Sequence, residues 1–367
     1  MKPAMKRRDV LAWGAASLMM TSCTSKEPPP PERMASQRLK PLPQALGGQF
    51  AGVHKGALIV AGGSYFPTPK WEGGEKRWVN SVYVMRKPIP ITAREGGWET
   101  FALPAPRAYG GTVSNADGVL LIGGSDEKAH YREVLRVRWD GSTISVSEAA
   151  PLPVSLANCA AVEVTGVAYV VGGQETPEAT SASKALYSLD LGRTNAEWKE
   201  EAALPGAGRI LPAVAALDGK LYVASGADLY SDEDGKAARR YLQDAWCFTP
   251  GQGWEQLPDL PRATCAAPAA GYPNTFLVFG GSDGTLDARA DELKDDHPGF
   301  SREILLYRPS EGAWRTAGFH AVEGLVTTTA ARWDDDYFVI PGGEDRPAHR
   351  SATVSRYLYV PEGAGVE

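Results

Sequence analysis

The loop that follows the apolar run Tyr337–Ile340 carries the residues best suited to chemistry. It spans Gly343 to Arg350 and reads Gly-Glu-Asp-Arg-Pro-Ala-His-Arg, and its Glu-x-Arg-Pro-x-x-Arg pattern occurs once in the chain. A carboxylate close to guanidinium groups can accept a proton, pair with them or help to bind a polar ligand. The bland alternative is a surface ion pair between Glu344 and Arg350, which would contribute roughly 0 to 1 kcal/mol. Because the apolar run recurs along the chain and the loop does not, we interpret the run as scaffold and the loop as the candidate site.

Apolar runs that end in small residues recur every roughly 50 to 60 residues, close to the period of kelch propeller blades. They lie at 58–63, 119–124, 167–173, 220–226, 276–281 and 337–343. Each run follows a short turn and another apolar strand, and an aromatic strand comes after it; a fourth strand often begins at Trp and ends in Leu-Pro. We therefore predict an all-β fold, a six-bladed kelch-type β-propeller. The sixth unit lacks a fourth strand after Val360, so we expect the N-terminal segment around Leu39–Pro43 to close the last blade.

The lengths of the loops predict which face of the propeller is functional. Connections from the second to the third strand are long and polar, and they share a face with the connections from the fourth strand to the next blade. The latter carry Arg107, Arg209 and Arg262, so we expect these arginines, with Arg346 and Arg350, at the mouth of the axial channel. Guanidinium groups bind carboxylates bidentately, which favours a small acidic ligand. The alternative for each of the first three is a cap on backbone carbonyls.

Composition excludes some functions. The 367 residues carry a net charge of −6, which argues against nucleic acid as a partner. The 40 Gly and 28 Pro favour a fold of many short strands joined by turns. Cys159, Cys247 and Cys265 lack Cys-x-x-Cys spacing, so we expect neither a disulfide framework nor a zinc site. Buried thiols are the prediction, with one disulfide as the alternative, and we expect no metal site.

The N-terminus is typical of an export signal. A basic segment, Lys6–Arg8, precedes the apolar segment Val10–Met20, which is too short to span a bilayer. Met20-Thr-Ser-Cys23 resembles a bacterial lipobox and Arg7-Arg8 a twin-arginine signal, with plain secretion as the alternative. We expect residues 1–23 to be the export signal, 24–37 a Pro-rich tether and 38–367 the propeller. The protein would then lie in the periplasm or be anchored in the outer membrane through lipid on Cys23, with no other contact with a membrane.

Four motifs together resemble the sialic acid mutarotase, or N-acetylneuraminate epimerase, family. They are Gly47-Gly-Gln-Phe-Ala-Gly52, Trp71-Glu-Gly73 with Lys76, Arg107-Ala-Tyr-Gly110, and Gly343-Glu followed by Pro347 and Arg350. The first three of them lie near the C-terminus in typical members but come first here, so the chain resembles the cyclically permuted branch. The resemblance extends from about residue 38 to 360. Tyr65, where that branch has Asn, and Ser155–Asn158, which lacks an Arg of the typical members, depart from the pattern and bear on the identity of the sugar.

The resemblance implies that the protein interconverts the α and β anomers of N-acetylneuraminate by opening and reclosing the ring, without a cofactor. Glu344 is then the proton acceptor. Arg350 holds the substrate carboxylate or stabilises the oxyanion, because a guanidinium does not release its proton. Water, Tyr109 or His349 is the candidate acid. Glu72, Lys76 and Tyr109 join Arg107, Arg209, Arg262 and Arg346 as candidate substrate-binding residues.

Two other classes of protein use the same scaffold. A propeller lipoprotein that only binds glycans or proteins would keep the arginines but tolerate loss of Glu344. A copper-radical oxidase of the galactose oxidase type requires paired His and Tyr ligands with a Cys nearby. The five His of the chain are scattered, which disfavours the oxidase.

Overall fold

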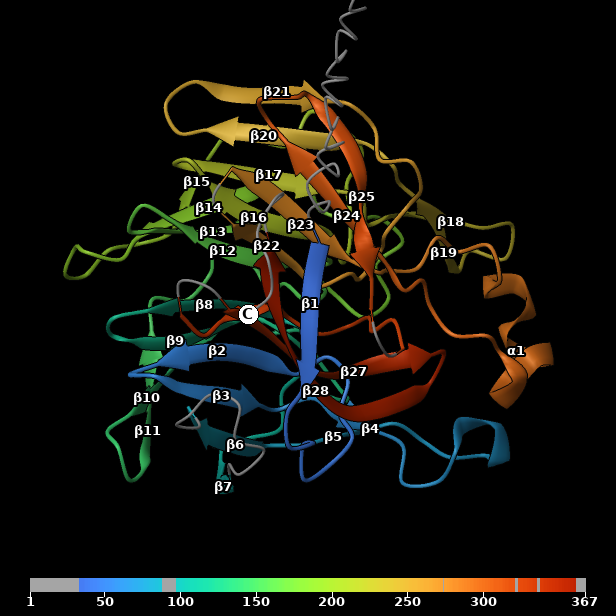
Figure 1. Cartoon of the computed structure of the whole chain (residues 1–367), viewed down its shortest axis with the longest axis horizontal. Coiled ribbons are helices and arrows are strands. Elements are labelled where there is room, and N and C mark those ends of the chain that lie inside the picture. Colours follow the sequence, from blue (N-terminus) through green and yellow to red (C-terminus); the bar gives the residue numbers. More distant parts are fainter. Residues whose placement is uncertain (1–32, 88–96, 273, 321–322, 335–336, 361–367) are drawn as a thin grey trace, which may run out of the picture.

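Six four-stranded antiparallel sheets surround a central axis in the computed structural model, which describes residues 33–87, 97–272, 274–320, 323–334 and 337–360 (Figure 1). The prediction of a six-bladed β-propeller is confirmed. The first blade contains β2 (Phe50–His54), β3 (Ala57–Ala61), β6 (Ser81–Arg86) and β7 (Trp98–Ala102), and the second β8 (Gly111–Asn115), β9 (Gly118–Ile122), β10 (Val134–Trp139) and β11 (Ile144–Ala149). The third contains β12 (Ala160–Val164), β13 (Val167–Val171), β14 (Leu186–Asp190) and β15 (Lys199–Glu200).

The other three blades repeat this plan. The fourth contains β16 (Ala213–Leu217), β17 (Lys220–Ala224), β20 (Ala245–Thr249) and β21 (Gly253–Leu257), and the fifth β22 (Ala269–Tyr272), β23 (Thr275–Phe279), β24 (Glu303–Arg308) and β25 (Ala313–Phe319). The sixth contains β26 (Ala331–Arg332), β27 (Tyr337–Arg346), β28 (His349–Val360) and β1 (Arg33–Arg38). The loops contain two hairpins, three 3-10 helices and one short α-helix. The hairpins are β4 (Ser64–Tyr65)–β5 (Arg77–Trp78) and β18 (Ala227–Ser231)–β19 (Ala237–Tyr241). The helices are η1 (Lys70–Glu72), η2 (Asp287–Arg289), η3 (Lys294–Asp296) and α1 (Ala290–Leu293).

The N-terminal segment closes the last blade, but through a strand earlier than expected. β1 pairs with β28 from Arg33 opposite Val360 to Arg38 opposite Ser355 (Figure 1). Residues 33–37 therefore belong to the propeller and not to the tether. Leu39–Pro43 continues beside β28, where the backbone N–H of Leu39 donates to the carbonyl of Val354 at 2.8 Å. Because Leu39 and Leu42 are buried between the first and last blades, this segment fastens the ring closed.

Tryptophans in or next to the outer strands join neighbouring blades. Trp198, Trp254 and Trp314 each donate their indole N–H to a backbone carbonyl of the preceding blade, at 2.7 to 2.9 Å. Trp98 of the first blade donates in the same way to Pro41 at 2.7 Å. Leu39–Pro43 thus takes the place of the Leu-Pro end of the other blades, which is the feature that the sequence pattern detected.

A closed ring of backbone hydrogen bonds lies around the axis and is called the axial ring below. Each of its members occupies the connection that enters a blade, has φ between 53° and 71°, and donates its N–H to the carbonyl of the member before it, at 2.6 to 3.0 Å. The members are Gly48, Tyr109, Asn158, Leu211, Ala266 and Thr327. Left-handed backbone costs about 1 to 3 kcal/mol for a residue other than Gly, so the bonded ring is what maintains it at these positions.

The small residues that end each second strand also have a steric reason. At Gly62 (φ +62°) an added Cβ would lie 2.0 Å from the carbonyl oxygen of Arg107, and the N–H of Gly63 donates to that same oxygen at 2.8 Å. Ser225, in place of the first Gly of the fourth blade, has φ +56°. Its hydroxyl donates to the carbonyl of Leu242 at 2.8 Å and accepts from the N–H of Thr264 at 2.7 Å. These two bonds offset the strain of a non-glycine residue there.

Three further predictions concern the cysteines, membrane-spanning segments and the N-terminal residues. Cys159, Cys247 and Cys265 are buried free thiols, as expected, and burial raises the pKa of Cys159 to about 12. Within the residues described, no helix is long and apolar enough to cross a membrane. The export signal, Cys23 and residues 24–32 of the tether lie outside the described residues.

His320 should make the stability of the propeller depend on pH. Nδ1 of its buried imidazole forms a hydrogen bond with the Tyr357 hydroxyl at 2.5 Å, whereas Nε2 has no hydrogen-bond partner. Burial, aided by the charge of Arg302, lowers the pKa of His320 to about 4. The unfolded chain takes up a proton near pH 6.5 and the folded protein only near pH 4, so the free energy of unfolding should fall by about 3 kcal/mol as pH drops through this window.

Chemical denaturation of wild type and His320→Gln between pH 7 and 4 measures that contribution. The variant should lack this part of the pH dependence, while the carboxylates titrate equally in both proteins and cancel. Parallel pH profiles would contradict the assignment to His320.

Candidate functional site

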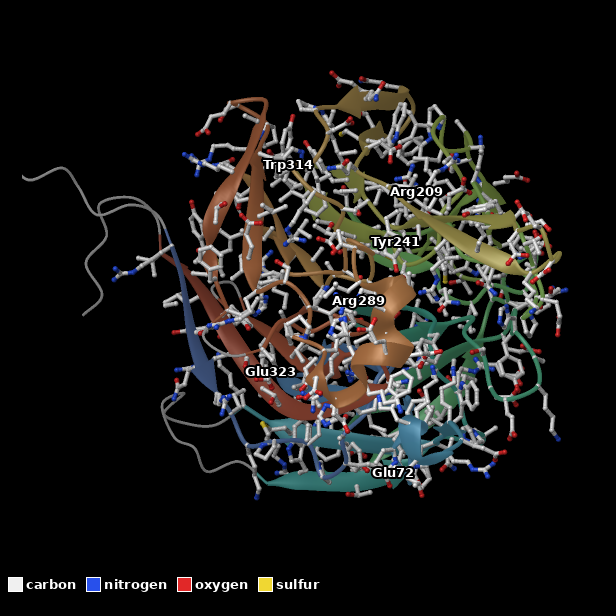
Figure 2. The ribbon with its side chains drawn as sticks, turned by 90° about the vertical axis from the view of Figure 1, so that its right-hand side faces the viewer. Glu72, Arg209, Tyr241, Arg289, Trp314 and Glu323 are labelled. Carbon is white, nitrogen blue, oxygen red and sulfur yellow. The ribbon has the colours of Figure 1, made fainter. Side chains whose placement is uncertain are left out.

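The long loops converge on a cavity of about 740 Å³ at one end of the axis. Side chains from the second-to-third-strand connections of all six blades line it, and Tyr109, Asn158, Leu211, Ala266 and Thr327 of the axial ring form its floor. Figure 2 looks onto this face, with α1 and Tyr241 toward the viewer. The prediction that these loops gather around one site is confirmed.

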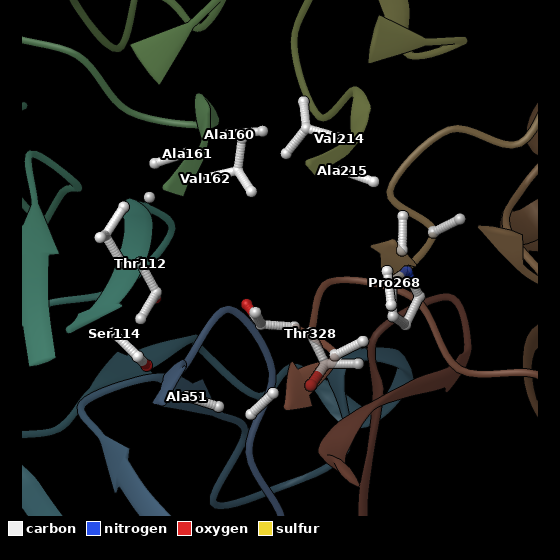
Figure 3. Close-up of a pocket in the computed structure, with 18 of the residues that line it drawn as sticks. Ala51, Thr112, Ser114, Ala160, Ala161, Val162, Val214, Ala215, Pro268 and Thr328 are labelled. Atoms are coloured by element: carbon white, nitrogen blue, oxygen red, sulfur yellow. The ribbon is translucent and has the colours of Figure 1, made fainter. Parts of the chain in front are cut away.

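The floor of this cavity separates it from a second one in the axial channel. That cavity, of about 520 Å³, lies among the innermost strands and is lined mainly by small residues such as Ala51, Ala160 and Ala215 (Figure 3). Thr112, Ser114 and Thr328 supply hydroxyl groups (Figure 3). Because small apolar side chains dominate its wall, it offers far less chemistry than the cavity at the loop face.

Glu344 and Arg350 form a buried ion pair in the wall of the loop-face cavity. They are cross-strand partners in β27–β28, and Oε2 of Glu344 lies 2.5 Å from Nη1 of Arg350. Oε1 accepts from the Thr327 hydroxyl at 2.9 Å, and Oε2 also accepts from the N–H of Ala348 at 3.3 Å. The side chains are only 13% and 6% exposed, so this pair differs from the solvated surface bridge considered above. Both carboxylate oxygens are held in fixed positions beside the cavity.

Tyr109 and Ser64 extend this cluster. The Tyr109 hydroxyl accepts from Nη2 of Arg350 at 3.0 Å and lies 2.7 Å from the Ser64 hydroxyl. Burial raises the pKa of Tyr109, so the phenol stays protonated at neutral pH. Burial alone would lower the pKa of Arg350, but Glu344 and Tyr109 outweigh it and raise the pKa. The cluster therefore combines a carboxylate, a permanent cation and a neutral hydroxyl.

Lys76 reaches the same wall through its ammonium group. This group lies over the rings of Trp78 and Tyr109, 4.4 and 5.0 Å from their centroids. Burial, with the nearby charge of Arg350, lowers the pKa of Lys76. The placement of Lys76 and Tyr109 in the cavity agrees with their predicted positions, whereas their roles stay predictions.

Gly47 and Gly48 make room for these side chains. A Cβ at Gly47 would lie 2.8 Å from Cδ and Nε of Arg350, and one at Gly48 would lie 2.4 Å from Cε1 of Tyr109. Gly48 also has φ +71° as a member of the axial ring. The Gly pair of the sequence motif is thus required by the close approach of the polar cluster.

Gly48→Ala should destabilise the protein more than Gly56→Ala. Gly56 has φ +73° but nothing within 4 Å of an added Cβ, so its substitution carries only the backbone strain, of about 1 kcal/mol. Gly48→Ala adds a collision with Tyr109 and should lower the free energy of unfolding by a further 1 to 3 kcal/mol or so. Denaturant titration of both variants measures the difference. Equal losses would mean that Tyr109 moves aside freely.

Three of the predicted arginines do not reach the cavity. Arg107 donates to the carbonyl of Glu133 at 3.1 Å, and Arg262 donates to Glu303 and to the carbonyl of Gly280 at 3.0 and 3.1 Å. Arg209, which Figure 2 labels, has no exposed surface; it pairs with Asp244 at 2.7 Å and donates to the carbonyl of Ser225 at 3.0 Å. Each of them bonds the next blade at its second-to-third-strand connection. The expectation that they surround the mouth is therefore wrong, and the alternative of a cap on backbone carbonyls holds.

Glu72, Arg346 and His349 are also absent from the lining of the cavity. Glu72 is exposed in η1, and Figure 2 places it at the edge of the molecule, away from Tyr241. Arg346 has Nε 4.0 Å from Asp295, and His349 has Nδ1 2.7 Å from Asp345 with 47% of its side chain exposed. The structure thus brings Glu344, Arg350, Tyr109 and Lys76 together but not these three.

Other residues of the cavity escaped the sequence interpretation. Thr327 orients the polar cluster together with the buried Ser64, which is not itself part of the lining. Phe66 lies against the guanidinium of Arg350 at 5.2 Å, and Arg239 projects from β19. Alternation along the strand Ala237–Tyr241 was the available signal for Arg239, since it assigns Arg239 and Arg240 to opposite faces. In the part of the chain described, no three His, Cys, Asp or Glu side chains are grouped as metal ligands.

Fold and site together define a six-bladed β-propeller with a buried Glu–Arg–Tyr cluster in a cavity at one end of its axis. Residues 149–289 match the sequence model of the family described as N-acetylneuraminate epimerase. The N-acetylneuraminate epimerase of Haemophilus influenzae strain PittEE is 30% identical over 206 residues, which are 50% of this chain and 54% of that protein. The Yersinia pestis strain Pestoides F protein of the same name is 28% identical over 200 residues, 47% and 50% of the two chains.

A solved structure, that of YjhT, has the same fold. It matches with a TM-score of 0.62 and 15% identity, over 86% of this chain and 95% of that one. The curated relatives are matched over about half their length. These comparisons confirm the resemblance of the chain to the N-acetylneuraminate epimerase family, whereas the cyclic permutation stays a prediction.

Proposed function

We propose that this protein is a mutarotase that interconverts the α and β anomers of N-acetylneuraminate. The observation that carries the proposal is the Glu344 carboxylate, fixed by Arg350 and Thr327 in the wall of a cavity of about 740 Å³, a volume typical of a small-molecule site. The similarity to proteins named N-acetylneuraminate epimerase supports this choice of sugar.

The proposed reaction begins with a proton transfer to Glu344. The carboxylate accepts the proton of the anomeric hydroxyl, the bond between the anomeric carbon and the ring oxygen breaks, and the ring oxygen takes up a proton. Rotation of the open-chain carbonyl and the reverse steps then give the other anomer. Positioned acid and base groups each contribute about 10²- to 10⁴-fold to such transfers.

The remaining roles follow from the contacts of the cluster. Arg350 stabilises the charge of Glu344 and orients Tyr109. Tyr109, a neutral phenol beside the cavity, or a water molecule supplies the proton to the ring oxygen. His349 is poorly placed for this role because it pairs with Asp345 outside the cavity lining.

Proton NMR exchange between the two anomers of N-acetylneuraminate tests the proposal directly. Addition of the protein should raise the exchange rate well above the spontaneous rate at the same pH. A folded protein that leaves the rate unchanged would favour the alternative of a propeller that only binds glycans or proteins.

We also propose that the protein is exported and carries lipid on Cys23. The support is the N-terminal sequence alone, with its basic segment, apolar segment and Cys23. Metabolic labelling with a radioactive fatty acid should mark the full-length wild-type protein and not Cys23→Ser. Label on both proteins or on neither would contradict lipidation at this residue.

A further inference from the structure

Most charged side chains that line the loop-face cavity already have partners. The acidic ones are Asp126, Glu127, Asp287, Asp291 and Glu344. Asp126 accepts from the Tyr131 hydroxyl, Asp287 from Tyr241, and Glu127 lies 3.9 Å from Arg77. Asp291 pairs with Lys70 at 3.6 Å, and Glu344 pairs with Arg350. Every carboxylate of the lining is therefore held by a donor or a cation.

Two cations of the lining have no such partner. Lys76 and Arg239 line the cavity, and among the described residues neither forms an ion pair with a carboxylate, although Arg239 shares a hydrogen bond with Tyr241 and lies near the charge of Asp287. Lys76 lies over aromatic rings, and Glu344, the carboxylate whose charge acts on it, is already paired with Arg350. Lys70 pairs with Asp291 and Arg350 with Glu344, so Lys76 and Arg239 are the cations of this lining that an anionic ligand can pair with without displacing a carboxylate.

The pairing of β18 with β19 fixes the direction of Arg239. Arg239 lies opposite Leu229, which is buried, whereas Arg240 lies opposite Asp228 and pairs with it at 2.5 Å with 66% of its own side chain exposed. Cross-strand partners share a face of the hairpin, so Arg239 is on the inner face and Arg240 on the outer one. The side chains of both neighbours are exposed, but of the two only Arg239 lines the cavity.

We propose that Arg239, assisted by Lys76, binds the carboxylate of the acidic sugar and sets the selectivity for sugar acids over neutral sugars. This inference rests on the proposed function, and it replaces the carboxylate-binding role that the sequence suggested for Arg350. Arg350 is committed to Glu344, Tyr109 and Ser64, and Arg107, Arg209 and Arg262 are bonded within the scaffold. A guanidinium binds a carboxylate through two parallel hydrogen bonds, and the Lys76 ammonium adds a point charge.

Anomer exchange kinetics of Arg239→Gln, Lys76→Met and the control Arg240→Gln test the inference. Loss of a charge-assisted contact should raise KM for N-acetylneuraminate about ten- to a hundredfold in Arg239→Gln and change kcat far less, with partial recovery in Arg239→Lys. Arg240→Gln should match wild type. The methyl ester of the sugar, which lacks the negative charge, should be bound equally weakly by wild type and Arg239→Gln.

Direct binding of N-acetylneuraminate, measured by calorimetry, separates this inference from the proposed function. If wild type accelerates exchange and Arg239→Gln keeps its KM, the inference is overturned and the function stands. If wild type binds without accelerating exchange, the function fails, and weaker binding by Arg239→Gln than by Arg240→Gln still supports the anion site. If wild type neither binds nor accelerates, both are overturned.

Discussion

Glu344→Gln should reduce the acceleration of N-acetylneuraminate anomer exchange by about 10²- to 10⁴-fold while the sugar still binds. The amide has the size of the carboxylate and its oxygen can still accept from Thr327, but it cannot take a proton at neutral pH. The measurement is the exchange rate at saturating sugar, together with the dissociation constant. Unchanged turnover in the variant would remove Glu344 from the mechanism.

A matched control separates lost chemistry from lost stability. Glu344→Gln leaves the guanidinium of Arg350 buried without an anion, which can cost about 3 to 5 kcal/mol. Glu323→Gln alters another partly buried glutamate outside the cavity lining, one that accepts from Thr353 at 2.7 Å and lies 3.6 Å from Arg38. It should lose some stability but keep its turnover. Both variants are therefore compared at equal concentrations of folded protein.

Arg209→Met should have the largest effect on stability and little effect on turnover per folded molecule. It removes the partner of Asp244 and the donor to the carbonyls of Ala207 and Ser225, in a place where Arg209 has no exposed surface. Breaking a buried pair costs about 3 to 5 kcal/mol, because the remaining charge is left uncompensated. Denaturant unfolding measures the loss, and anomer exchange measures the turnover.

The comparison variant for this prediction is Arg240→Gln, which breaks an exposed pair and should change the free energy of unfolding by less than about 1 kcal/mol. A stable Arg209→Met with a raised KM would instead restore the substrate-binding role that the sequence suggested.

The fold was accessible from the sequence because each blade repeats the same local pattern. An apolar strand that ends in small residues can be recognised without knowledge of its neighbours. The chain leaves that strand through a left-handed residue, which is Gly in every blade except the fourth. β1 escaped detection because Arg33–Arg38 has no alternation of apolar and polar residues. Its strand conformation comes from pairing with β28.

Some residues of the site could be placed from the sequence and others could not. Glu344 and Arg350 could be paired from the sequence, since they are cross-strand partners within one hairpin and local spacing determines their contact. The side chains of Arg107, Arg209 and Arg262 could not be placed from the sequence. They occupy equivalent positions in their blades, but this equivalence does not determine whether a long side chain points toward the axis or toward the next blade. In the structure they point toward the next blade, where they donate hydrogen bonds to the backbone carbonyls of Glu133, Ser225 and Gly280.

The number of blades, the face that carries the long loops and the pair Glu344–Arg350 could thus be predicted from the sequence. The folded structure was needed to show which cations line the cavity and how the axial ring forms its floor. The reason is that those contacts join residues of different blades, far apart in the chain, whose proximity exists only once the propeller has closed.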